Sequence, residues 1–149
     1  MMKEKEFLVP QLSVFIENRL SSLAKLTRCI ANRNINLRGF SLAESREFGA
    51  ARIIVSDVVS CREVLQAAGY HFVETDVLAV AVSDRPGGMA DVLEGLAAEQ
   101  VNVEYAYAMI DKHLESAIII LRVPDPLKVV MILRKTNVRL LTWKDVTLL

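Results

Sequence analysis

The chain has 149 residues, 52% of them apolar, which is enough for one medium domain or two small ones with a packed core. Lysine plus arginine and aspartate plus glutamate both number 18, so no net charge attracts nucleic acid or an anionic membrane. No apolar run could span a membrane, and MMKEKEFLVPQLSVFIEN mixes both charge signs where a secretory signal needs an uninterrupted apolar segment. We therefore expect a cytoplasmic protein.

The two cysteines, Cys29 and Cys61, form no CxxC pattern and lie near no pair of histidines. We expect packed, reduced thiols and neither a metal site nor a redox site. No serine, cysteine or histidine constellation typical of catalysis is present, so we expect a protein without enzymatic activity and without a cofactor.

An internal repeat organises the chain. At the offset between Arg19 and Arg85, 66 residues, segment 13–56 aligns with segment 79–122 without a gap, and many of the other pairs exchange one apolar residue for another. The identical pairs are Val14/Val80, Arg19/Arg85, Ala24/Ala90, Ala31/Ala97, Asn36/Asn102, Ala51/Ala117, Ile53/Ile119 and Ile54/Ile120.

Each copy predicts the same order of elements, with a first helix marked by apolar residues at helical spacing and strands marked by β-branched runs. In the first copy we expect strands at 11–16, 36–45, 51–55 and 71–77, a helix through Leu23, Leu26 and Ile30, and a helix at 60–69 with Ser60 as its cap and Gly69 as its stop.

The second copy repeats this pattern. We expect strands at 78–82, 102–110, 116–121 and 138–146, a helix through Met89, Val92 and Leu96, and a helix at 125–136 capped by Asp125. The segments REFG and DKHL are short enough to be hairpin connections.

The predicted fold is α+β, with two ferredoxin-like βαββαβ repeats. In each repeat, two helices cover one face of an antiparallel sheet. We expect the first repeat at residues 1–76 and the second at 77–149, with the hinge near Asp76 and Val77.

The second copy predicts strands that are buried on both faces, because VLAVAV and SAIIIL are apolar without alternation. A second layer must cover the face opposite the helices, from the first copy or from another chain. Since large apolar patches usually mark interfaces, we expect a homodimer.

The stretch SDRPGGMADV, residues 83–92, indicates a ligand site at the start of a helix. The first amides of a helix lack internal partners and attract anions, and glycines allow a ligand to approach closely. A carboxylate suits this place, and Asp84 at the strand end could accept hydrogen bonds from an ammonium group. Asn36 and Asn102 could line the same clefts, although asparagine also favours such turns.

The segment DRPGGMADVLEGLAAEQVNVEYAY resembles the opening of an ACT domain, whose usual pattern runs Asp/Asn-Arg-Pro-Gly, a helix, then Gly-Val-Asn-Ile. Gln100 stands where a glycine is common. The first copy, ENRLSSLAKLTRCIANRNINLRGF, keeps Asn-Arg and Asn-Ile-Asn but has Leu20-Ser21 in place of Pro-Gly. The resemblance covers roughly residues 10 to 146, which indicates a tandem ACT protein.

This resemblance implies a regulatory module that binds an amino acid or a related metabolite at interfaces between paired domains and regulates amino-acid metabolism, acting on a metabolic enzyme. It also implies which residues contact the ligand, from the loop before each first helix and the turn after it. These are Asn18, Arg19, Leu20, Ser21, Ser22, Asn36 and Leu37 in the first copy, and Asp84, Arg85, Gly87, Gly88, Met89, Asn102 and Val103 in the second.

Other functions of the same layout stay open at this stage. An acylphosphatase-like enzyme would use an arginine in a phosphate-binding loop with a nearby asparagine, as Arg85 and Asn102 could be. A protein-interaction scaffold with decayed pockets is a further alternative. An RNA-recognition sheet needs aromatic residues that ARIIV and SAIIIL lack, and a metallochaperone needs a cysteine pair.

Overall fold

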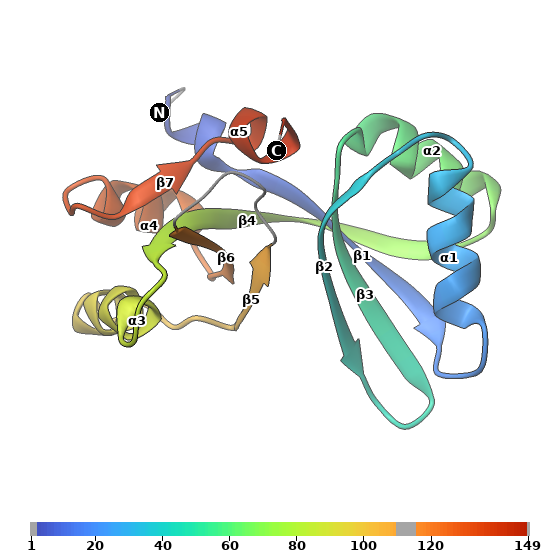
Figure 1. Cartoon of the computed structure of the whole chain (residues 1–149), viewed down its shortest axis with the longest axis horizontal. Coiled ribbons are helices and arrows are strands. Elements are labelled where there is room, and N and C mark those ends of the chain that lie inside the picture. The colour runs from blue at the N-terminus through green and yellow to red at the C-terminus, as the bar shows by residue number, and fades with distance from the viewer. Residues whose placement is uncertain (1–2, 110–115, 149) are drawn as a thin grey trace. The chain divides into compact units, whose positions relative to one another are not determined.

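The computed structural model describes residues 3–109 and 116–148. The chain forms two compact units (Figure 1). Pro10–Thr75 forms the N-terminal unit, and Asp76–Leu149 forms the C-terminal unit together with the chain up to Val9.

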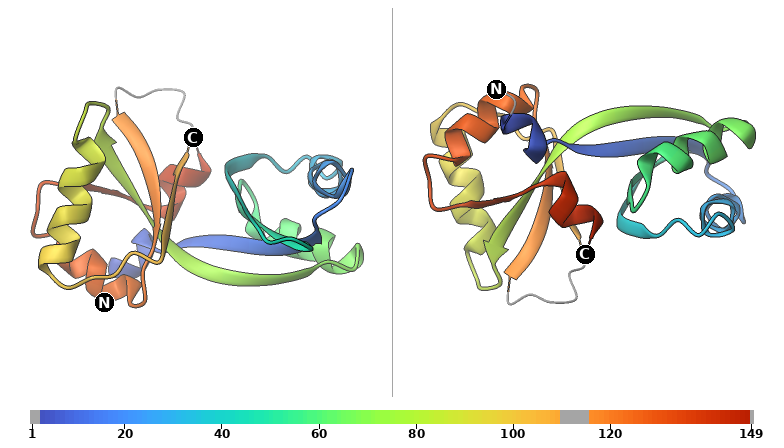
Figure 2. Two further views of the ribbon diagram at one scale, coloured as in Figure 1. Left: turned by 90° about the horizontal axis from the view of Figure 1, so that it is seen from below. Right: turned by 90° about the horizontal axis from the view of Figure 1, so that it is seen from above.

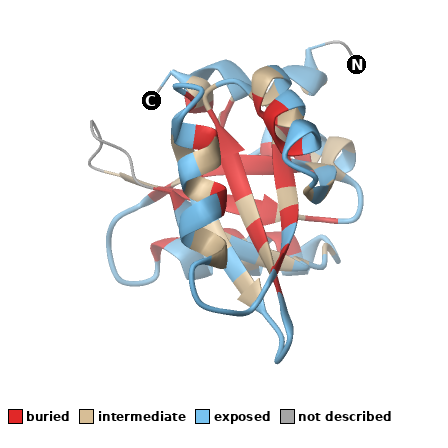
Figure 3. Cartoon of the chain, turned by 90° about the vertical axis from the view of Figure 1, so that its right-hand side faces the viewer, coloured by how far each residue is buried: buried red, intermediate tan, exposed pale blue. Residues whose placement is uncertain are grey.

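The N-terminal unit is built from β1 (Val9–Glu17), α1 (Ser22–Ala31), β2 (Leu37–Glu44), β3 (Phe48–Val55), α2 (Val58–Ala67) and the first residues of β4 (His71–Ser83). Both β1 and β2 pair antiparallel with β3. Strand residues such as Leu12 and Val14 point to the helices and pack with Leu26, Ile30 and Leu65 in one apolar core. Figure 3 shows α1 and α2 in front of these buried strands.

The C-terminal unit contains the rest of β4, α3 (Gly88–Ala98), β5 (Tyr105–Met109), β6 (Ser116–Arg122), α4 (Pro126–Leu133), β7 (Arg139–Leu141), α5 (Trp143–Thr147) and the 3-10 turn η1 (Glu4–Phe7). Strand β6 pairs antiparallel with β4 and β5, and β7 pairs with β4. Leu96 of α3 and Val130 of α4 pack on Val80 and Leu121 of the sheet, and Figure 2 shows both helices on one side of it.

These elements confirm the predicted fold class, two ferredoxin-like α+β repeats. The strands at 78–82 and 118–121 are largely buried on both faces, as their apolar runs predict, and Ile118 and Ile120 are fully buried. This burial is reached within a single chain, so it does not by itself require a second copy.

Several boundaries differ from the prediction. The expected strands at 71–77 and 78–82 are one strand, β4, because no glycine or proline interrupts the segment. The expected strand at 102–110 begins only at Tyr105. The cap of α2 is Asp57, whose side chain accepts from the Ser60 N–H, and Ser60 itself lies inside the helix. Asp125 caps α4 as predicted, and the connection DKHL lies outside the described residues.

The expected strand at 138–146 is also wrong, because only Arg139–Leu141 is extended and a short helix, α5, follows. Thr142 and Asp145 start this helix with reciprocal hydrogen bonds: the Asp145 N–H donates to Thr142 Oγ1 at 3.1 Å, and the Thr142 N–H donates to Asp145 Oδ2 at 2.9 Å. Such a capping box ends the strand.

The division between the repeats differs from the expected one at the N-terminus. Phe7 and Leu8 pack against the core of the C-terminal unit. Arg134, the C-cap residue of α4, pairs with Glu4 at 3.1 Å, and its guanidinium lies 5.9 Å from the centre of the Phe7 ring. The chain before Pro10 therefore belongs with the second repeat.

Over the described residues, no helix is long and apolar enough to cross a membrane.

Candidate functional site

The loop between β1 and α1 is a tight turn held by its own backbone. The Arg19 N–H donates to the Glu17 carbonyl at 3.0 Å, and the Ser22 N–H donates to the Arg19 carbonyl at 3.3 Å. Ser21, the N-cap residue of α1, has a φ of 71°, which is left-handed, and its hydroxyl makes no capping hydrogen bond. Serine rarely adopts this backbone conformation, because its Cβ is crowded there.

The loop between β4 and α3 has the same conformation at the positions that the repeat equates. The Arg85 N–H donates to the Ser83 carbonyl at 2.9 Å, and the Gly88 N–H donates to the Arg85 carbonyl at 3.0 Å. Gly87 is left-handed with a φ of 86°. The predicted equivalence of the two loops therefore extends to their hydrogen bonds.

The two glycines of the second loop have separate structural roles. Gly87 supplies the left-handed backbone without strain. Gly88 is buried, and a Cβ placed on it would lie 2.1 Å from the Ser83 carbonyl oxygen. Close packing of α3 on the strand end thus explains Gly88 without a ligand.

The side chain of Arg85 lies across this second loop. Its Nη2 lies 2.5 Å from Asp91 Oδ2, and its Nη1 donates to the Pro86 carbonyl at 3.1 Å. It also lies 3.5 Å from the Cβ position of Gly87. The guanidinium is therefore already engaged by the protein, which counts against the phosphate-binding role that an acylphosphatase-like site requires.

The remaining predicted residues of the second copy lie around this loop at the surface. Asp84, Met89 and Asn102 are exposed, and Val103 is half-buried.

The side chains of the first loop are less enclosed. Arg19 Nε lies 2.9 Å from Glu17 Oε2, and both side chains are more than half exposed. Asn18 is fixed to the β2–β3 hairpin, since its Nδ2 donates to the Ser45 carbonyl at 3.1 Å. Leu20 is 95% exposed, so packing among the described residues does not explain this apolar side chain.

The turn after α1 is held by two hydrogen bonds between Asn36 and Ser56. The Asn36 N–H donates to Ser56 Oγ at 2.9 Å, and the Ser56 N–H donates to the Asn36 carbonyl at 2.9 Å. The Asn36 side chain is exposed and Leu37 is half-buried at the start of β2.

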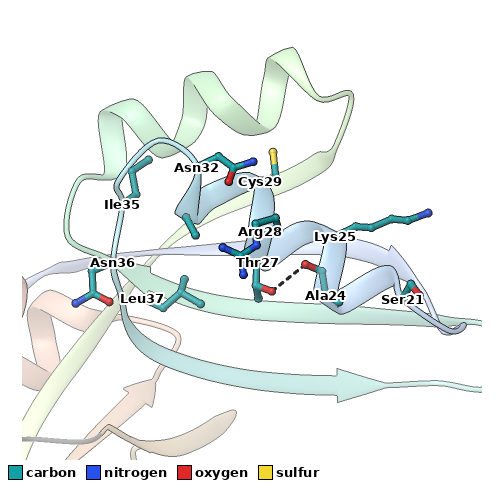
Figure 4. A pocket seen from close by; sticks show the side chains of 11 residues that line it. Ser21, Ala24, Lys25, Thr27, Arg28, Cys29, Asn32, Ile35, Asn36 and Leu37 are labelled. Atoms are coloured by element: carbon teal, nitrogen blue, oxygen red, sulfur yellow. Dashed lines mark hydrogen bonds between the residues drawn. The ribbon is translucent and has the colours of Figure 1, made fainter.

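Three cavities surround α1 and the first loop. An open groove of about 960 Å³ runs along α1, with Ser21 at the start of the helix and Asn36 and Leu37 beyond its other end (Figure 4). A small cleft of about 50 Å³ contains Asn18, Arg19 and Ser22. A cavity of about 240 Å³ is lined by Phe15, Ile16, Glu17, Arg19, Leu20, Ser22, Lys25 and Tyr70.

A fourth cavity, of about 480 Å³, lies in the C-terminal unit between α3 and α4. Asp91, Gly95 and Glu99 form its α3 wall, and Ile132, Lys135 and Thr136 lie opposite. None of the predicted site residues of the second copy lines it.

The 240 Å³ cavity adds five residues that sequence reasoning missed: Phe15, Ile16, Glu17, Lys25 and Tyr70. Lys25 lies in the first turn of α1. Its place near the start of the predicted helix could have indicated it as a site residue. Burial raises the pKa of the Tyr70 hydroxyl, and the neighbouring Cys29 thiol acts in the same direction, so Tyr70 is a neutral hydrogen-bond donor. Together with Arg19, these residues give the cavity two cations, one carboxylate and an apolar wall.

Burial also raises the pKa of the Cys61 thiol, to about 11, with smaller contributions from Cys29 and Asp57. Both cysteines are free thiols. Among the described residues, no group of three or more histidine, cysteine, aspartate or glutamate side chains could hold a metal ion.

Comparison with known proteins identifies the fold. Residues 7–148 match the family model described as an ACT domain pair. The crystal structure of protein BT0572 from Bacteroides thetaiotaomicron is 33% identical, with 96% of this chain and 98% of that chain covered and a TM-score of 0.89. No curated protein matches the chain.

Two more distant structures share the fold. The ligand-free regulatory subunit of aspartate kinase from Thermus thermophilus is 13% identical, with 87% of this chain and 94% of that chain covered and a TM-score of 0.64. The regulatory subunit of aspartate kinase from Thermus flavus is 18% identical, with 82% and 90% covered and a TM-score of 0.56.

Proposed function

The chain belongs to the ACT domain pair family, a regulatory and non-catalytic type of domain, and on this premise we propose that it is a sensor that binds an amino acid or a related small metabolite. Binding takes place at the loops that precede α1 and α3 and regulates amino-acid metabolism. No cofactor takes part.

The observation that carries this function is the composition of the 240 Å³ cavity. Arg19, Lys25 and the positive end of the α1 dipole favour a carboxylate, and Glu17 can accept hydrogen bonds from an ammonium group. Phe15 and Tyr70 provide an apolar wall for a side chain. A free α-amino acid carries the three complementary features: a carboxylate, an ammonium group and a side chain.

The strained backbone of Ser21 supports the same location. A non-glycine residue in the left-handed region costs about 1–3 kcal/mol and is concentrated at functional sites. The equivalent position of the second loop avoids this cost with Gly87. We therefore assign the first loop as the principal site and the second loop, with Asp84, Arg85, Gly87, Gly88, Met89, Asn102 and Val103, as a secondary one.

The sensor acts as a homodimer in the cytoplasm, where Cys29 and Cys61 stay reduced. Its partner is an enzyme of amino-acid metabolism. The Thermus relatives of the same fold are regulatory subunits of aspartate kinase, which supports this kind of partner without identifying it.

A thermal-shift screen of the twenty amino acids tests the function. A ligand that binds only the native state stabilises it by about 2.7 kcal/mol at a concentration of 100 times its dissociation constant, so a cognate amino acid should raise the melting temperature. Arg19→Ala should abolish this rise because it removes a cation from the cavity. The matched control, Arg85→Ala in the second loop, should retain most of it.

No shift with any amino acid would contradict the sensor function and favour a protein-interaction scaffold. A shift that depends on Arg85 but not on Arg19 would move the principal site to the second loop.

A further inference from the structure

The cavity between α3 and α4 lies where the two repeats differ in sequence. Gly95, in the middle of α3, aligns with Cys29 of α1 at the repeat offset of 66 residues. Cys29 packs against the core cluster of the N-terminal unit, which includes Cys61 of α2. The helices α1 and α2 pack directly on one another, whereas α3 and α4 make no comparable contact among the described residues. The second repeat therefore has space between its helices where the first repeat has a side chain.

The size and the apolar lining of this cavity fit a small ligand. Its volume, about 480 Å³, lies within the usual range of small-molecule sites. Val92 and Leu133, which are buried, and the half-buried Val138 supply apolar surface. Gly95 has no atom within 4 Å of its Cβ position, so packing among the described residues does not explain a residue type that weakens a helix.

Two charged side chains of the lining have no ion-pair partner in the described part of the chain. Glu99 on the α3 wall and Lys135 in the turn after α4 are exposed, and over residues 3–109 and 116–148 neither forms a salt bridge. Asp91, the other carboxylate of the lining, is held by Arg85. Glu99 is also the C-cap residue of α3, where a carboxylate opposes the helix dipole, so helix stability does not explain it.

We propose that this cavity binds a zwitterion whose two charges are separated by an apolar body, such as a dipeptide of apolar residues. The ammonium group of the ligand meets Glu99, and its carboxylate meets Lys135. The body between them covers Val92, Leu133 and Val138 and enters the space beside Gly95.

The separation of the two charges in the cavity decides between this ligand and a free α-amino acid. Glu99 and Lys135 belong to opposite walls and form no ion pair with each other. In an α-amino acid both charged groups are bonded to the same carbon, so pairing with one wall leaves the charge on the other wall unpaired. A dipeptide or an ω-amino acid carries its ammonium and carboxylate at opposite ends of a chain. The site is therefore independent of the amino-acid site proposed at the first loop.

Titration of the isotope-labelled full chain with leucyl-leucine tests the ligand, with binding followed by the NMR signals of the Val92, Gly95 and Val138 amides. The dipeptide should shift these signals to saturation. Its N-acetyl derivative lacks the ammonium group and its C-terminal amide lacks the carboxylate. Each should bind about tenfold more weakly or worse, because one charge of the cavity then stays unpaired. Free leucine should bind no more tightly than the two blocked dipeptides.

The compound ε-aminocaproate distinguishes the two sources of separated charges, because it carries both charges on a chain without side chains. An affinity equal to that of leucyl-leucine would support the recognition of separated charges alone and an ω-amino acid as ligand. A weaker affinity would support a peptide whose apolar side chains also contribute.

Paired variants on α3 locate the site. Gly95→Leu fills the cavity and should abolish dipeptide binding, whereas Ala97→Leu adds the same side chain to an exposed position outside the lining and should retain it. Glu99→Gln should weaken binding by about tenfold, because it removes the carboxylate that meets the ammonium group. Its control, Glu94→Gln, removes the same charge from α3 outside the lining and should leave the affinity unchanged.

The opposite wall offers a second matched pair. Lys135→Gln should weaken dipeptide binding by about tenfold, and Lys128→Gln, at an exposed position of α4 outside the lining, should not. Arg19→Ala, which removes a cation of the first-loop cavity, should also leave dipeptide binding unchanged. Failure of this site and failure of the proposed function are thus measured separately.

Circular dichroism verifies that each variant is folded. Equal affinity of the free and the blocked dipeptides would overturn the proposal. So would dipeptide binding that survives Gly95→Leu, or spectra that stay unchanged up to the solubility limit of leucyl-leucine.

Discussion

Individual residues of the two loops show how one backbone conformation is made from different sequences. Gly87 and Ser21 share the left-handed region, with φ of 86° and 71°. Gly88 and its equivalent Ser22 begin the two helices. The position of the glycine pair could be predicted from the sequence, but the reason for Gly88 could not, because the approach of the Ser83 carbonyl is a property of the folded chain.

Substituting Gly88 with alanine should destabilise the protein by about 1–3 kcal/mol, since the new methyl group overlaps the Ser83 carbonyl oxygen. Gly95→Ala is the matched control, because its Cβ meets open space, and it should stabilise α3 by up to about 1 kcal/mol. Urea unfolding monitored by circular dichroism measures both changes. Equal effects of the two substitutions would refute the packing role of Gly88.

A reciprocal exchange at the N-cap positions tests the strain at Ser21. Ser21→Gly should stabilise the chain by a few tenths to about 1 kcal/mol, because it removes left-handed strain but adds flexibility to the unfolded chain. Gly87→Ser should destabilise it by about 1 kcal/mol for the opposite reason. Thermal unfolding measures the stability of both variants. A loss of stability in Ser21→Gly would contradict the claim that the backbone of Ser21 is strained.

At the scale of elements, periodicity predicts the first helix of each repeat and the central strands, whereas the ends depend on caps. Thr142 and Asp145 form a capping box whose spacing was visible in TWKD, and it replaces an expected strand with α5. The fusion of two expected strands into β4 has a different origin: sequence alone does not reveal whether a strand ends at the boundary between two units.

The cap of α2 should make stability depend on pH. The Ser60 hydroxyl and then the Ser60 N–H donate to Asp57 and lower its pKa below the ordinary 3.8. A lowered native pKa stabilises the fold above the unfolded pKa, and this contribution disappears as the pH falls through the native pKa. Asp57→Ala should therefore be less stable than the unchanged chain at pH 7. Between about pH 5 and about pH 2, the free energy of unfolding of the variant should fall by less than that of the unchanged chain. Parallel acid-induced losses in both proteins would argue against the cap.

For the whole molecule, the internal repeat predicted the fold class, because a common apolar rhythm in two segments requires two similar cores. The family was predicted from the resemblance of the segment that begins DRPGG to the opening of an ACT domain. The cavities could not be predicted in this way. Three of the four cavities described lie around α1 and the first loop, whose sequence departs further from the usual ACT pattern. In the second loop the Arg85 side chain pairs with Asp91 and lies across the loop. In the first loop Lys25 occupies the position of Asp91, so the equivalent pair does not form. The exchange of Asp91 for Lys25 is thus one of the differences between two loops that share a backbone conformation.

The most direct measurement of the central claim is an isothermal titration of the full chain with the amino acid that gives the largest thermal shift, alongside its methyl ester. If α1, Arg19 and Lys25 bind the carboxylate, the free amino acid should occupy one site per chain, and the ester, which keeps the ammonium group but lacks the carboxylate charge, should bind about tenfold more weakly or worse. Equal affinity for the two compounds, or equal occupancy of two sites per chain, would contradict it.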